Sequence, residues 1–166
     1  MKKKNLRYRI GENSIRKALK NNARKISFPS INSIKTIGII CHAETDEQQF
    51  TSPLIQHAQR TIVRVYNSKR PKENIDTALY KSDINFWGLP SKKYIKPFMD
   101  EAFDILIDLT GSTNQAIEYI CAKSKAGFKA GTNPECPAFD LIINISNNDS
   151  QTLINEIERT LKNLNQ

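Results

Sequence analysis

From residue 35 onward, short apolar runs alternate with segments of helical periodicity, and this alternation limits the folds open to the chain more than any other feature. The run FDILIDLT at 103–110 is apolar enough to be buried on both faces of a sheet. Buried strands that alternate with helices are typical of an α/β layered domain with a mostly parallel sheet. Right-handed crossovers favour a Rossmann-like order with the run at 35–41 near the centre and 103–110 beside it. A flavodoxin-like order is also compatible with the pattern.

The individual elements follow from the same pattern. Apolar and β-branched runs predict strands at 35–41, 61–66, 84–88, 103–110, 127–131 and 139–146. Helical spacing of apolar residues predicts helices at about 48–59, at 91–102 with a bend or late start at Pro97, from 116 to near Gly127, and from Asp149 or Ser150 to Leu164. The polar stretch 67–83 predicts a solvated loop with room for a helical turn.

The first 34 residues form a basic N-terminal arm ahead of a Rossmann-like domain at 35–166. Apolar residues recur within the arm at three- and four-residue spacing, while basic residues occupy other faces. This spacing predicts an amphipathic helix over about residues 14–26. Asn13 or Ser14 is the expected N-cap, and Pro29 marks the end of the helix.

The positive charge of the chain is concentrated in this arm. The net charge is +8, yet residues 1–35 carry eleven lysines and arginines against one acidic residue, Glu12, which is a balance of +10. The remaining residues carry 14 basic and 16 acidic side chains, a balance of −2. A solvated face normally mixes charges of both signs. The near absence of acidic residues therefore points to a polyanionic partner.

Three roles fit a basic amphipathic helix: docking on the body, binding anionic lipid and binding nucleic acid. Docking does not explain why the segment ahead of the predicted helix is also basic. The apolar face of the helix contains neither Trp nor Phe and is too small for firm membrane insertion. About ten cations give strong, salt-sensitive binding to phosphates, and basic segments that order on contact suit structured RNA. The predicted nucleic-acid-binding residues are Lys2, Lys3, Lys4, Arg7, Arg9, Arg16, Lys17, Lys20, Arg24 and Lys25.

Length and composition place the chain among single globular domains, with 166 residues and 39% apolar side chains. No run approaches the roughly 20 apolar residues of a membrane span. The start, Met1 to Lys4, leads into polar residues rather than a secretory signal, so we expect a cytoplasmic protein. The three cysteines, Cys41, Cys121 and Cys136, are widely spaced and predict core thiols rather than a disulfide framework or a zinc site.

A candidate anion or small-ligand site follows the strand at 103–110. Ligands of open parallel sheets bind at the carboxyl ends of the strands. Asp108, Gly111, Ser112 and Thr113 lie there, and free N–H groups at the following helix start would hold an anion such as phosphate. The simpler interpretation, which we favour, is that Ser112 or Thr113 caps its own helix and Asp108 bonds nearby backbone or a lysine.

Catalytic, metal and cofactor motifs are missing from the sequence. The segment 41–47 has carboxylates where GxGxxG would bind a dinucleotide, and no Walker A loop occurs. His42 is the better functional candidate of the two histidines, because His57 is expected to be exposed on a helix. Neither belongs to a metal-ligand spacing, and Cys41 has no activating partner in the sequence. We therefore expect no catalytic residue, no metal and no cofactor.

The aromatic pair Phe86 and Trp87 has two interpretations. Aromatic side chains near lysines can stack nucleobases or sugars. A third strand that packs against a neighbouring helix explains the same residues more simply, and we expect Phe86 and Trp87 in the core.

The block FDILIDLTGSTNQAIEYICAKSKAGFKAGT at 103–132, with FDLIINIS at 139–146 and a C-terminal helix, resembles an uncharacterised bacterial family of short Rossmann-like proteins. It is also distantly similar to the N-terminal half of the heptosyltransferase-type family 9 glycosyltransferases, in which a D-x-x-I-D strand, a helix and a K/R-x-G strand follow one another. The counterparts here are Asp104, Asp108, Lys129 and Gly131. Those enzymes place the sugar-nucleotide site in a second domain, and this chain ends where that domain would begin. The resemblance thus implies a half-enzyme retained as a binding or scaffold module.

Together these features predict a non-enzymatic RNA-binding protein associated with the ribosome, with structured RNA such as ribosomal RNA and neighbouring ribosomal proteins as partners and without membrane insertion. Two alternatives remain open. One is a small-ligand or sugar-nucleotide binding domain, and the other is a protein-interaction subunit whose arm binds an acidic partner. The oligomeric state is not specified by the sequence.

Overall fold

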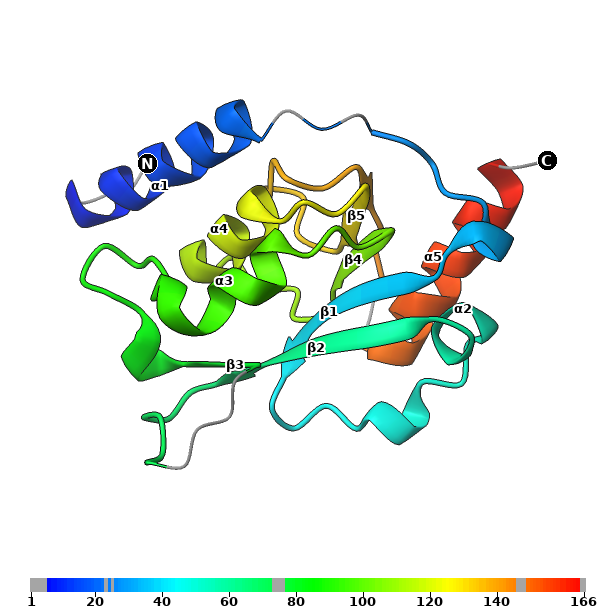
Figure 1. Cartoon of the computed structure of the whole chain (residues 1–166), viewed down its shortest axis with the longest axis horizontal. Coiled ribbons are helices and arrows are strands. Elements are labelled where there is room, and N and C mark those ends of the chain that lie inside the picture. Colours follow the sequence, from blue (N-terminus) through cyan, green and yellow to red (C-terminus); the bar gives the residue numbers. More distant parts are fainter. Residues whose placement is uncertain (1–5, 23, 25, 73–76, 146–148, 165–166) are drawn as a thin grey trace.

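The computed structural model describes residues 6–22, 24, 26–72, 77–145 and 149–164, which form a layered α/β domain (Figure 1). The helices are α1 (Leu6–Asn21), α2 (Pro53–Gln56), α3 (Lys92–Asp100), α4 (Gln115–Lys123) and α5 (Ser150–Leu164). The strands are β1 (Thr36–His42), β2 (Gln59–Tyr66), β3 (Ala78–Tyr80), β4 (Ile105–Asp108), β5 (Phe128–Gly131) and β6 (Leu141–Ile142). Short 3-10 helices lie at Ile31–Ser33, Glu47–Gln49 and Lys81–Asp83.

The strands form a parallel sheet in the order β3-β2-β1-β4-β5-β6. β1 lies near the centre, with Ile39 opposite Ile62 of β2 and Ile107 of β4. This is the Rossmann-like order predicted from the sequence, and it excludes the flavodoxin-like alternative. The order of strands reverses between β1 and β4, so the crevice at their carboxyl ends is the expected place for a ligand.

Helices cover both faces of the sheet and form two apolar clusters with it (Figure 1). On one face, Ile95 and Phe98 of α3 and Ile120 of α4 pack against the strands. On the other face, Leu54 of α2 and Ile157 of α5 do the same. α1 lies outside α4 as an additional layer (Figure 1). The basic arm is thus attached to one face of the domain.

The third strand lies at Ala78–Tyr80, within the predicted loop, and not at 84–88. Residues 85–88 form a turn, because Gly88 N donates to Asn85 O at 3.0 Å and Gly88 adopts φ +79°. That φ lies in the left-handed region, which favours glycine. The core prediction for Phe86 and Trp87 is also wrong, since the turn directs them outward and they are 68% and 38% exposed.

α1 begins at Leu6 and ends at Asn21, earlier at both ends than the predicted helix at 14–26. Ser14 is not an N-cap, because its Oγ donates to Ile10 O at 3.0 Å inside the helix. Packing on α4 stabilises this earlier start, since Gly11 and Ile15 are both buried. The chain leaves the helix well before Pro29.

Other boundaries differ for local reasons. The predicted helix at 48–59 is divided into the 3-10 helix at Glu47–Gln49 and the short α2, because Pro53 lacks an N–H and starts a new helix. The apolar residues of this segment, Phe50, Leu54, Ile55 and Ala58, are nevertheless buried. α4 ends at Lys123 rather than near Gly127, and β6 is a short edge strand. The predicted core positions of Cys41, Cys121 and Cys136 are confirmed.

Within the described ranges, no helix combines the length and the apolar character needed to cross a membrane.

Candidate functional site

The inner face of α1 anchors the helix on α4. Ile15 and Ala18 are buried against the body. Beyond the end of α1, the side-chain amide of Asn22 donates to the carbonyl oxygens of Ala122 at 2.8 Å and Ser124 at 2.7 Å, at the end of α4. Carbonyl groups at a helix end lack partners within the helix, so Asn22 satisfies them. Docking of the arm is therefore part of the fold.

Arg24 also belongs to this anchor. Its guanidinium donates to Gly127 O at 2.9 Å and lies 2.7 Å from both carboxylate oxygens of Asp140. The two side chains are only 16% and 5% exposed. A guanidinium held in this way is not free for an RNA phosphate. We therefore assign Arg24 a structural role, although the sequence placed it among the nucleic-acid-binding residues.

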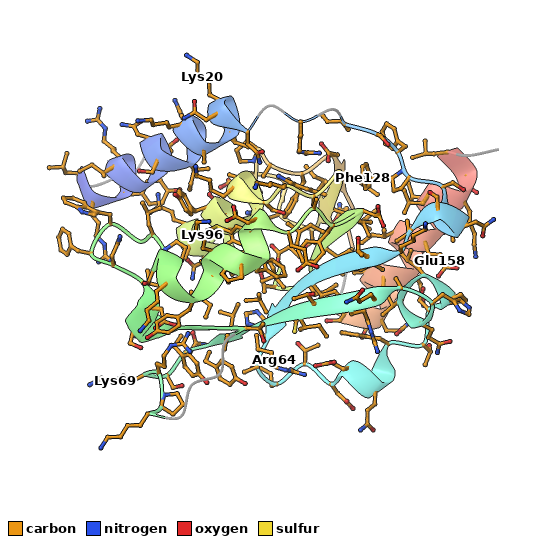
Figure 2. The ribbon with its side chains drawn as sticks, viewed as in Figure 1. Lys20, Arg64, Lys69, Lys96, Phe128 and Glu158 are labelled. Atoms are coloured by element: carbon orange, nitrogen blue, oxygen red, sulfur yellow. The ribbon has the colours of Figure 1, made fainter. Side chains whose placement is uncertain are left out.

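The outer face of α1 presents a row of cations, Arg9, Arg16, Lys17 and Lys20, at helical spacing. All four are exposed, and Figure 2 shows Lys20 pointing away from the body. Arg16 pairs with Glu12 at 2.9 Å. The other three form no ion pair with any described residue. We call Arg9, Lys17 and Lys20 the outer cations.

The remaining predicted cations lie elsewhere. Arg7, in the first turn of α1, places its guanidinium carbon 5.2 Å from the centre of the Phe86 ring. Lys2, Lys3, Lys4 and Lys25 lie outside the described residues.

A cleft of about 690 Å³ opens at the carboxyl ends of β2 and β3, next to the start of α4. Arg7 and Lys81 line it, and none of the described lining residues is acidic. Tyr66 and Tyr80, whose ring centroids lie 4.6 Å apart, form part of the wall together with Thr113. The volume is typical of small-molecule sites, and this edge of a Rossmann-like sheet is where ligands bind. The cleft suits a small anion.

Sequence reasoning missed most of this cleft, because its wall brings together α1, the ends of β2 and β3 and the start of α4, which are far apart in the chain. Of the four predicted anion-site residues, Thr113 lines it and the other three do not. Lys81 stood in a segment interpreted as a solvated loop, and no motif marked it. Only the fold brings it near Arg7.

Asp108, at the end of β4, is hydrogen-bonded to the residues that follow it in the chain. It is 1% exposed, and its carboxylate accepts hydrogen bonds from Thr110 N at 2.9 Å and Thr110 Oγ at 2.7 Å. Burial raises the pKa of Asp108 to about 6, against the opposing effect of these two bonds. The favoured prediction, that this carboxylate bonds nearby backbone, is confirmed.

The loop after Asp108 is closed by its own hydrogen bonds. Gly111 adopts φ +59°, and Ser112 Oγ accepts from Asn114 N at 3.1 Å. Asn114 Oδ1 then accepts from Ala116 N at 2.9 Å, so Asn114 is the N-cap of α4. The predicted cap at Ser112 or Thr113 is wrong, because the helix starts later and Ser112 instead supports the turn before it.

The buried nucleophiles and bases are in structural positions. Burial raises the pKa of the Cys41 thiol to about 11, so thiolate is scarce at neutral pH. His42 Nε2 lies 3.2 Å from Thr110 O, and His57 is exposed as predicted. Lys129 is 1% exposed, and its Nζ donates to Cys121 O at 2.7 Å. Among the residues with described positions, no cluster of His, Cys, Asp and Glu could hold a metal ion.

The residues that carry the glycosyltransferase resemblance have structural contacts. Asp104 accepts from the backbone N of Lys35 at 2.7 Å and of Thr36 at 2.9 Å, which joins the start of β1 to β4. Gly131 leaves room for the ring of Phe139, since a Cβ there would lie 2.5 Å from ring atoms.

The model of a family of unknown function, DUF6913, matches residues 7–164, from the first turn of α1 to the end of α5. The chain belongs to this family. Because the match includes α1, the DUF6913 region contains the docked basic helix together with the sheet. The comparison with curated proteins gave no match, and the comparison with solved structures gave none either.

Proposed function

We propose that this DUF6913 protein binds RNA without catalysis, through phosphate contacts made by the outer face of α1. The observation that carries the proposal is the division of the helix into two faces. The apolar face is docked on α4, while the outer cations Arg9, Lys17 and Lys20 project outward and have no acidic partner among the described residues. Unpaired cations of this kind neutralise phosphates and release counterions.

The docked geometry favours a phosphate backbone over a lipid surface. A helix that lies on a membrane inserts its apolar face between the lipids. Here that face, with Ile15 and Ala18, is buried against the body. The outward face is polar, and the outer cations extend over about 16 Å of helix, long enough to follow several phosphates. Structured RNA, with ribosomal RNA as the proposed physiological partner, offers such a surface.

The direct test removes the outer cations together. We expect the triple variant R9Q/K17Q/K20Q to bind a fluorescein-labelled 20-nucleotide RNA hairpin at least about tenfold more weakly at roughly 50 mM salt. In a plot of the logarithm of the association constant against the logarithm of the salt concentration, the magnitude of the slope should decrease by about 2, since three phosphate contacts are lost. Fluorescence anisotropy over a salt series measures both quantities. Gln preserves the helix, because its helix propensity is close to that of Lys and Arg.

A matched control removes the same charge from other surfaces. Lys35, Arg60 and Lys69 are exposed and lie outside α1, and Figure 2 shows Lys69 far from that helix. The variant K35Q/R60Q/K69Q should retain most of the affinity. Equal losses of RNA affinity in the two triple variants would show that binding depends on net charge alone and would contradict the proposal. Failure of the unmodified protein to bind the hairpin would contradict it too.

Association with ribosomal particles is tested by sedimentation. We expect the protein to pellet with ribosomal particles at low salt and to be released after nuclease treatment. Persistence in a pelleted complex after complete RNA digestion would instead identify a protein partner and contradict the RNA proposal.

The cleft supports a second candidate function, the binding of a small phosphorylated ligand. We infer it from the cationic lining by Arg7 and Lys81 beside the start of α4. A ligand at about one hundred times its Kd, with adenosine 5′-monophosphate and glucose 1-phosphate as probes, should raise the Tm by about 5–10 °C. The shift should be much smaller for Lys81→Gln and unchanged for Lys69→Gln, which lies outside the cleft. No shift with either probe, or the same shift in all variants, would exclude these ligands from the cleft.

A further inference from the structure

Two aromatic side chains project into solvent next to α1. Phe86 is 68% exposed and Trp87 is 38% exposed, and their rings meet edge to face with centroids 5.1 Å apart. Leu6, at the start of α1, is also exposed. A soluble domain rarely leaves large aromatic side chains exposed together without a binding role.

The loop that carries these rings is held in shape by hydrogen bonds between its own residues. Asn85 Oδ1 accepts from Trp87 N at 2.9 Å and from Leu89 N at 3.1 Å. Asn85 N donates to Leu89 O at 2.8 Å, and Ile84 pairs with Pro90 at the base of the turn. The hydrogen bonds of the turn therefore hold Phe86 and Trp87 outward in a defined geometry, which limits the entropy lost when a ligand stacks on them.

The same loop is fixed against α1. A Cβ on Gly11 would lie 2.7 Å from both Trp87 O and Gln115 Oε1, so only glycine allows the helix to approach the loop this closely. Gln115 Nε2 also donates to Tyr8 O at 2.8 Å. The aromatic rings are thereby held beside the N-terminal end of α1, where the Arg7 guanidinium lies over the Phe86 ring.

We propose that Phe86 and Trp87 form a stacking platform for unpaired RNA bases beside the N-terminal end of α1, the helix that carries the outer cations on its outer face. This proposal rests on the proposed function and narrows its substrate to RNA with single-stranded nucleotides, such as the loops of a structured RNA. Aromatic side chains stack bases of any sequence while neighbouring cations hold the backbone. Arg7, in the first turn of α1, supplies such a cation beside the rings.

The surrounding charge favours RNA over an apolar protein partner. Among the described residues, Phe86 and Trp87 are exposed side by side, and the exposed Arg7 places its guanidinium over the Phe86 ring. A protein-docking surface of standard size has a fully desolvated core depleted of charged residues. A pair of rings beside an arginine guanidinium is instead the combination that binds single strands.

The single tryptophan of the chain makes the test specific, because Trp87 is the only Trp in the sequence. We expect a 12-nucleotide oligoadenylate to quench the intrinsic Trp fluorescence on binding. A 12-base-pair RNA duplex, and a 12-unit oligomer of abasic tetrahydrofuran phosphates, should bind through charge with little quenching. The abasic oligomer carries the backbone charge without any base. Equal quenching by the abasic oligomer and oligoadenylate would overturn the platform.

Two substitutions at Phe86 separate stacking from general apolar contact. Phe86→Leu keeps an apolar side chain but removes the ring, and should weaken oligoadenylate binding about tenfold. Phe86→Tyr keeps the ring and should bind nearly as the unmodified protein does. Both variants should keep the Tm of the unmodified protein, because the side chain is exposed. Unchanged affinity in Phe86→Leu would overturn the platform.

The outcomes also separate this proposal from the proposed function. If oligoadenylate and the abasic oligomer bind equally well and both are weakened by R9Q/K17Q/K20Q, the phosphate-binding function stands and the platform is wrong. If none of the oligomers, nor the hairpin, binds at low salt, both proposals fail.

Discussion

Replacing Arg24 with Gln is expected to lower the free energy of unfolding by about 3–5 kcal/mol. The Asp140 carboxylate, whose side chain is 5% exposed, would lose the guanidinium that lies 2.7 Å from both of its oxygens. Removing one partner of a buried ion pair leaves an uncompensated charge, which costs more than the pair itself contributes. For a chain of this length the corresponding fall in Tm is about 10 °C or more. Thermal and urea unfolding measure the effect.

The control for Arg24→Gln is Arg16→Gln, which removes the same charge from the same arm. The Arg16 and Glu12 side chains are 71% and 32% exposed, so the loss should be about 0.5 kcal/mol or less. The double variant R24Q/D140N should recover part of the loss, because the unpaired carboxylate is also removed. Similar losses in the two single variants would show that the Arg24 contact does not anchor the arm.

The free energy of unfolding should also depend on pH, because the ionisation of Asp108 changes it by about 3 kcal/mol. Burial raises the pKa of this carboxyl to about 6, whereas an unfolded chain has an Asp pKa of about 3.9. The folded state therefore binds the proton more tightly. The contribution from protonated Asp108 is fully present below about pH 4 and is lost as the pH rises through 6.

The measurement compares the unmodified protein with Asp108→Asn by urea unfolding from pH 4 to pH 8. The amide does not ionise but keeps an oxygen that can accept from Thr110 N and Oγ. The free energy of unfolding of Asp108→Asn, minus that of the unmodified protein, should rise by roughly 2–3 kcal/mol across this range. Any constant effect of the amide cancels in this comparison. A difference that does not change with pH would contradict the raised pKa.

The central elements of the fold could be predicted because each carries a strong local signal. The runs at 35–41 and 103–110 are predominantly apolar, and such runs are buried wherever a parallel sheet forms. The third strand could not be found in this way. Ala78–Tyr80 is too short to show a pattern, and its identity depends on pairing with β2. The aromatic run at 84–88 looked more like a strand, but Asn85 and Gly88 bend it into a turn.

The candidate site likewise has features that the sequence predicts and features that only tertiary contacts decide. The concentration of cations in the arm was visible in the sequence, and so was the apolar stripe that docks it. Which cations are available was not visible, because Arg24 and Lys20 look alike in a basic segment. Arg24 meets Asp140, 116 residues away, whereas Lys20 faces solvent. Exposure of Phe86 and Trp87 likewise depends on the turn and on its packing beside Gly11.

The sequence by itself determined the α/β class, the central strands and the charge imbalance between arm and body. Hydrophobic periodicity and net charge depend only on residues that are close together in the chain, so they do not require the tertiary structure. Tertiary structure alone decided which cations remain unpaired, which aromatic rings reach solvent and where the cleft opens. Those outcomes depend on contacts between residues about one hundred positions apart, such as Asn22 with Ser124 and Tyr8 with Gln115. Such contacts form only once the sheet has brought the distant segments together.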